Sequence, residues 1–90
     1  MPVAYADPQH LREFAHKLKA FAQDIDHYTN TVNGGMRRLG ESWRDEYYYR
    51  FEEVFAEAAV MLHELAEASR ELAPHLEHDA EIIDKRRPIK

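Results

Sequence analysis

Histidine and carboxylate side chains are the groups of this chain that could bind a metal ion. Ligands on one helix must lie three or four residues apart to share a face. Glu71, His75 and His78 have this spacing. Asp24 and His27 have it too. We expect solvated histidines without a resident metal or cofactor, with a metal-binding helical bundle built on Glu71, His75 and His78 as an alternative.

No nucleophile stands in a pattern typical of catalysis. Ser42 suits a helix cap, and we expect the hydroxyl of Ser69 to bond back to its own helix. The chain has no cysteine, so disulfides and thiolate metal sites are excluded. Gly34-Gly35 lacks the following Lys and Ser or Thr of a phosphate-binding loop. We predict that the protein is not an enzyme.

The only tryptophan, Trp43, precedes three consecutive tyrosines. Neighbouring helical residues point about 100° apart, so the three tyrosines cannot all face one core. At least one should be exposed beside Trp43, and exposed Tyr and Trp are typical of protein-binding hot spots. Trp43 either closes the loop end of a bundle, in which case Trp43→Ala should cost about 3–5 kcal/mol, or contributes to docking. The predicted protein-interaction residues are Trp43, Tyr47, Tyr48, Tyr49, Phe51 and Phe55.

Length and charge limit the function further. Ninety residues form at most one domain, and a net charge of −5 disfavours a nucleic-acid partner. No run of 18 apolar residues is present, so we expect no membrane span. The first residues have neither the basic nor the apolar region of a signal peptide. We therefore expect the protein to be secreted without a conventional signal peptide or to stay in the cytoplasm.

The first half of the chain reads as one amphipathic helix over about residues 8–32. Asp7-Pro8 is a strong start, because Asp caps free N–H groups and Pro is tolerated at the first helical position. Apolar residues then recur three and four residues apart. They are Leu11, Phe14, Leu18, Phe21, Ile25, Tyr28 and Val32. We expect Gly34 or Gly35 to end the helix in the left-handed conformation, within a turn over residues 33–42.

The second half predicts a helix over about residues 43–73, capped by Ser42 or Asp45. Its apolar positions are Phe51, Phe55, Ala58, Leu62, Leu65, Leu72 and Leu76, with Ser69 on the same stripe. Pro74 should kink or stop this helix. The predicted domain covers residues 1–85, followed by a flexible tail over 86–90.

A short connection makes two long helices antiparallel neighbours, so the fold class is an all-α two-helix hairpin. Both apolar stripes are wider than one helix pair needs. A second hairpin would cover them and form a four-helix bundle, which would also stabilise a small chain that lacks disulfides. The predicted core and dimer residues are Leu11, Phe14, Leu18, Phe21, Ile25, Val32, Leu62, Leu65 and Leu72.

With Leu39 four residues before Trp43, Phe51 eight after it and Phe55 four further on, the chain resembles the WXG family of type VII secretion proteins. These are small helical hairpins with a Trp-Xaa-Gly turn, and the resemblance covers most of the chain. Asp45 stands where the family has its turn glycine. An Asp can start a helix as its N-cap, so the hairpin survives the change.

The resemblance implies a homo- or heterodimer with itself or a paralogous hairpin, exported folded by an ATPase-driven system. The protein would be a secretion substrate or the small partner of a larger effector, and it could contact the secretion ATPase. The tyrosine of the family's usual C-terminal export signal is missing. His75, Asp79 and Ile82 partly match a second family pattern, with Arg86 in place of its last His. A cytoplasmic adaptor that is not exported is the alternative.

Overall fold

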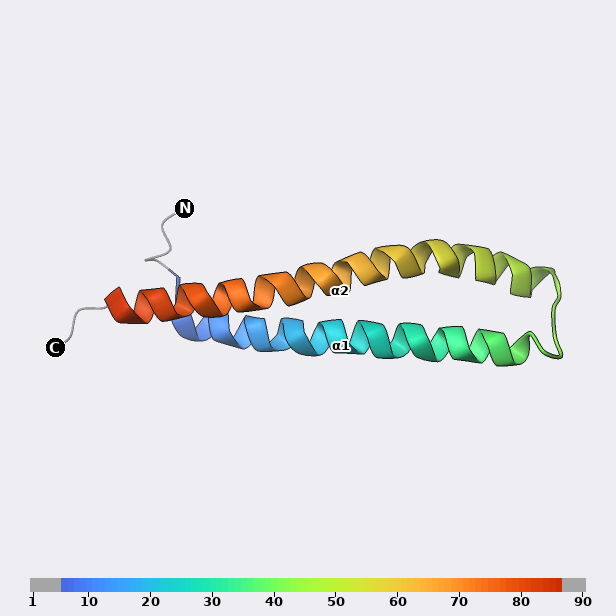
Figure 1. Ribbon diagram of the computed structural model, residues 1–90, viewed down its shortest axis with the longest axis horizontal. Helices are drawn as coiled ribbons and strands as arrows, with labels where there is room; N and C mark the ends of the chain where they lie inside the picture. The colour runs from blue at the N-terminus through green and yellow to red at the C-terminus, as the bar shows by residue number, and fades with distance from the viewer. Residues whose placement is uncertain (1–5, 87–90) are drawn as a thin grey trace.

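In a computed structural model, which describes residues 6–86, the chain forms an antiparallel hairpin of two long helices (Figure 1). Helix α1 spans Pro8–Leu39 and helix α2 spans Glu46–Arg86, joined by residues 40–45. The hairpin is a rod of 69 × 21 × 13 Å. The predicted all-α helical hairpin is therefore confirmed. Its pairing into a four-helix bundle stays a prediction.

Helix α1 starts where the sequence indicates. The carboxylate of Asp7 accepts a hydrogen bond from the backbone N–H of Gln9 at 2.9 Å. Pro8 occupies the first helical turn, where its missing N–H is not needed, and it is buried. Residues 1–5 lie outside the described part of the chain.

The predicted end of the first helix is wrong. Helix α1 runs through Gly34 and Gly35 to Leu39, and no glycine of residues 6–86 has a positive φ. Two helical glycines cost about 1 kcal/mol each relative to alanine. Contacts beyond them offset this cost, because Met36 is half-buried and its carbonyl accepts a hydrogen bond from the Tyr48 hydroxyl of α2 at 3.1 Å.

Side chains of the connection form hydrogen bonds with backbone groups at the ends of both helices. Gly40 ends α1, and its carbonyl accepts a 2.6 Å hydrogen bond from the Arg44 side chain. The Asp45 carboxylate accepts a 2.9 Å bond from the N–H of Tyr48 and caps α2. Helix α2 therefore starts at Glu46, three residues later than predicted, and Asp45 rather than Ser42 is its cap.

Pro74 does not stop the second helix, which continues to Arg86. A proline inside a helix removes one hydrogen bond and costs about 3 kcal/mol. Pro74 is exposed, whereas Ala73 before it and Ala80 after it are fully buried against α1. Packing on both sides of the proline holds the helix together. The predicted tail is thus helical at Arg86, and residues 87–90 lie outside the described residues.

The helices meet along a row of small side chains, which we call the alanine seam. Its members recur every seven residues on each helix, as in a coiled coil. The fully buried ones are Ala15 and Ala22 of α1 and Ala66, Ala73 and Ala80 of α2. A single methyl group lets two backbones approach closely. As a result, no large side chain among residues 6–86 is fully buried.

Three ion pairs connect the helices along one edge of the seam, and we call them the ion-pair ladder. The pairs are Arg12 with Asp84 at 2.6 Å, Lys19 with Glu77 at 2.7 Å, and Asp26 with Arg70. Each step moves seven residues forward on α1 and seven back on α2, so the pairs share one register. Half-exposed pairs add little stability individually. The ladder therefore specifies register more than it stabilises the hairpin.

Within residues 6–86, neither helix contains a stretch both long and apolar enough to cross a membrane.

Gly34 and Gly40 should respond oppositely to replacement by alanine, because their surroundings differ. Gly34 has nothing within 4 Å of an added Cβ, so Gly34→Ala should stabilise the protein by about 0.5–1 kcal/mol. A Cβ on Gly40 would overlap the Tyr48 hydroxyl and lie 3.0 Å from its Cζ, so Gly40→Ala should cost about 1–3 kcal/mol. Urea unfolding followed by circular dichroism measures both changes. A destabilising Gly34→Ala would contradict the continuous helix.

Candidate protein-interaction surface

The edge of the seam opposite the ladder is apolar. Ladder residues lie four positions after a seam residue, as Lys19 follows Ala15 and Arg70 follows Ala66. Residues one position before a seam residue lie about 140° around the helix from the ladder residues. The ladder residues of α1 and α2 meet on one side of the seam. The residues that directly precede the seam residues on both helices therefore lie together on the other side.

That side, which we call the apolar flank, consists of large exposed side chains. They are Phe14, Phe21 and Tyr28 of α1 and Phe51, Leu65 and Leu72 of α2. Each keeps between 40% and 65% of its surface exposed. A row of this kind along the length of a soluble protein is typical of a surface that binds another protein. The flank is therefore the strongest candidate site of the molecule.

Two shallow grooves lie along the apolar flank. The first, of about 430 Å³, has Ile25 and Leu62 at its base and the rings of Phe21 and Tyr28 at its rim. The second, of about 280 Å³, lies at the loop end between Leu39 and the aromatic residues that follow. Side chains of a partner helix could enter both grooves.

The predicted aromatic residues divide between this surface and the interior. Trp43, Tyr47 and Phe51 line the second groove and are exposed. Tyr48 is only 8% exposed and helps to close the turn. Tyr49 is exposed but is not part of that groove. The expectation that at least one tyrosine is exposed near Trp43 is confirmed.

Phe55 stacks on Phe51, with ring centroids 5.8 Å apart, and is half-buried. It extends the contact from the aromatic loop end into the first groove. The role of all six predicted aromatic residues in binding a partner stays a prediction.

The predicted core stripe is divided in the same way. Ile25 is buried in a cluster with Ala22 and Ala66, against which Leu62 packs. Leu11 and Leu18 are half-buried. The other members are exposed in the single hairpin, and their place in a dimer interface stays a prediction. They are Phe14, Phe21, Val32, Leu65 and Leu72.

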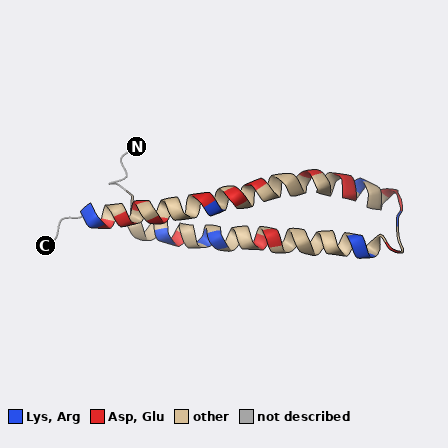
Figure 2. Ribbon diagram, viewed as in Figure 1, with Lys and Arg blue, Asp and Glu red and all other residues tan. Residues whose placement is uncertain are grey.

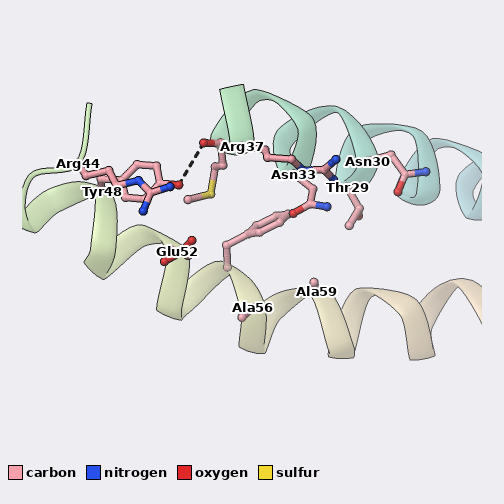
Figure 3. Close-up of a pocket in the computed structure, with 11 residues that line it drawn as sticks. Thr29, Asn30, Asn33, Arg37, Arg44, Tyr48, Glu52, Ala56 and Ala59 are labelled. Atoms are coloured by element: carbon pink, nitrogen blue, oxygen red, sulfur yellow. Dashed lines mark hydrogen bonds between the residues drawn. The ribbon is translucent and has the colours of Figure 1, made fainter. Parts of the chain in front are cut away.

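A polar cavity of about 430 Å³ opens between the helices near the loop, on the ladder side of the seam (Figure 3). Tyr48 and Phe55 line it together with Ala56 and Ala59 of α2. Arg37, Arg44 and Glu52 line the cavity. The cavity is open to solvent, and it brings together no nucleophile and base.

The histidines and acids do not assemble a metal site within residues 6–86. His75 lies 3.3 Å from Asp79, one turn along its own helix. Glu13 and His16 also have a three-residue spacing, which the sequence analysis did not weigh. They lie between Arg12 and Lys17 on a shallow surface, where two cations would repel a metal ion.

The candidate export residues His75, Asp79 and Ile82 lie within α2 rather than on a tail. Asp79 and Ile82 are half-buried, and His75 is exposed. Ser69 is buried on the seam, and its hydroxyl donates to the Leu65 carbonyl at 2.8 Å, which confirms the predicted bond back to the helix.

No known protein family, characterised protein or solved structure matches the chain in comparisons of its sequence and fold.

The exposure of Trp43 changes what its removal should do. The ring is 58% exposed, so Trp43→Ala should alter the free energy of unfolding by less than about 1 kcal/mol. Ile25→Ala, at a position only 9% exposed, should cost about 2–5 kcal/mol. Urea unfolding at low protein concentration compares the two variants. A Trp43→Ala loss as large as that of Ile25→Ala would show that the ring is packed in the single hairpin.

Proposed function

We propose that the protein is a non-enzymatic, WXG-like helical hairpin that binds a second helical hairpin through its apolar flank and belongs to type VII secretion. It acts as a secreted substrate or as the small partner of a larger effector. The observation behind this proposal is the row of large exposed side chains opposite the ion-pair ladder.

Energetics support the use of this flank as an interface. Fully burying one Leu or Phe side chain is worth about 1.5–3 kcal/mol. The flank presents five Leu or Phe side chains and one Tyr, in one heptad row on each helix. Such rows match the knobs that a facing helix pair accepts in a four-helix bundle. A single hairpin leaves this free energy unused, because its own helices meet through alanines.

The secretion part of the proposal is supported by the turn. Trp43 and its flanking apolar residues keep the family spacing, and Asp45 starts α2 as an N-cap in place of the family glycine. The C-terminal residues that partly match an export pattern lie on a helix packed against α1. Recognition of the folded hairpin, rather than of an unfolded tail, is consistent with this arrangement.

Removing apolar side chains from the flank should abolish association. At about 1 M NaCl, where the Debye length is about 3 Å, charge repulsion is screened and the wild-type chain should self-associate at micromolar concentration. Phe21→Ser combined with Leu72→Ser should weaken the self-association affinity at least about 100-fold. Each tenfold loss corresponds to roughly 1.4 kcal/mol, and each substitution should remove at least that much. Sedimentation equilibrium measures the dissociation constants.

The control is Val60→Ser, which removes an exposed apolar side chain outside the flank. It should associate like the wild type, and circular dichroism should show intact helices in both variants. A wild-type chain that stays monomeric at high salt would contradict the proposed interface.

Export is tested in a bacterium that has a type VII system. The wild-type protein should enter the culture medium when the membrane ATPase is present and remain in the cells when its gene is deleted. The Phe21→Ser/Leu72→Ser variant should remain in the cells in both strains, and the Val60→Ser variant should be exported. Retention of the wild-type protein in both strains would favour the cytoplasmic adaptor.

A further inference from the structure

The α2 border of the apolar flank is a row of three exposed glutamates, which we call the acidic row. It consists of Glu57, Glu64 and Glu71, spaced seven residues apart. Glu64 and Glu71 directly precede Leu65 and Leu72 of the flank, and Glu57 precedes Ala58 in the same heptad row, so each glutamate lies about 100° around the helix from that row. The acidic row therefore lies along the edge of the flank, where a partner helix would pack.

The acidic row has no basic counterpart within the hairpin. The acids of the ladder each pair with a Lys or Arg across the seam. Glu57, Glu64 and Glu71 form none of the ion pairs found within residues 6–86. Along the whole of α2, four Lys or Arg stand against eleven Asp or Glu (Figure 2). This helix therefore presents uncompensated negative charge at the edge of an apolar surface.

A second copy of the chain does not supply the missing charge. If α2 packed against α2 of the copy, acidic rows would face each other. If α2 packed against α1 of the copy, it would meet the equivalent positions of α1, one residue before Phe14, Phe21 and Tyr28. These are Glu13, Ala20 and His27, which offer no Lys or Arg to the three glutamates. Like charges brought together at an interface suppress that pairing.

We infer that the apolar flank binds a different chain, a helical partner whose apolar stripe is bordered by Lys or Arg at seven-residue spacing opposite Glu57, Glu64 and Glu71. This inference rests on the proposed function and chooses the heterodimer over the homodimer. Charges that border a coiled-coil seam determine which helices pair. The flank provides the affinity, and the acidic row selects the partner.

A charge-reversed copy of the chain can serve as the probe for this partner. Glu57→Lys/Glu64→Lys/Glu71→Lys retains the apolar flank and borders it with basic residues at the required spacing. At low salt, a mixture of this variant with the wild-type chain should form heterodimers at least about tenfold tighter than the wild type forms homodimers, a difference of roughly 1.4 kcal/mol. The preference should shrink at about 1 M NaCl, where screening acts over about 3 Å.

The control is Glu53→Lys/Glu67→Lys/Glu81→Lys, in which Glu67 and Glu81 also lose their ion pairs with Arg70 and Lys85 of the same helix. It makes the same change in net charge on exposed positions of the same helix, away from the flank. For each variant, the preference is the logarithm of the ratio between its affinity for the wild type and the affinity of the wild type for itself. The control variant should show less than half of the preference of the test variant. Sedimentation equilibrium with one fluorescently labelled species measures each pairing, and circular dichroism verifies that each variant is helical.

The outcomes separate the inference from the proposed function. A wild-type homodimer at low salt as tight as the mixed pair would overturn the acidic row as a selector while leaving the flank as an interface. Equal preference for the test and control variants would overturn it in the same way. A complete lack of association in every mixture, at low and high salt, would overturn both the inference and the proposed function.

Discussion

The close contact between two rows of alanine is the constraint on which the rest of this hairpin depends. Alanines spaced seven residues apart on each helix contribute only a methyl group to the contact, as Ala22 and Ala66 do near the middle of the rod. Backbones that approach this closely leave no room for large side chains between them. The Phe and Leu residues next to the seam are therefore displaced to its edges, and the hairpin buries little apolar surface of its own.

The two edges of the seam carry different kinds of side chain. On one edge, ion pairs such as Arg12–Asp84 link the helices and determine their register. On the other edge, residues such as Phe21 and Leu72 remain open to solvent. Since a domain of this size gains only a modest core, burial of that second edge against a partner is the largest source of stability still available to the chain. Folding and partner binding are thus expected to be energetically coupled.

Capping and helix-breaking residues predicted a helix end correctly only where the packing between the helices also ends. Asp7-Pro8 marks the start of α1, but Gly34-Gly35 and Pro74 do not break the helices, because the seam continues past both. The hairpin itself followed from heptad spacing. Heptad spacing did not identify the face through which the helices meet. Each helix has two adjacent heptad rows, one of small and one of large apolar side chains, and the sequence alone favoured the row of large side chains as the contact. Pairing of charges between distant residues, such as Lys19 and Glu77, would have identified the correct face.

The turn shows how the binding surface reaches the end of the rod. The Tyr48 ring packs over Gly40 and its hydroxyl donates to the carbonyl of Met36, so Tyr48 rather than Trp43 closes this end of the hairpin. The tryptophan ring is instead exposed next to Phe51, at the end of the apolar flank. One buried tyrosine thereby turns a residue expected to plug the bundle into part of its outer surface. A partner that covered the flank would also cover this ring, because the aromatic turn and the helical flank form one continuous apolar surface.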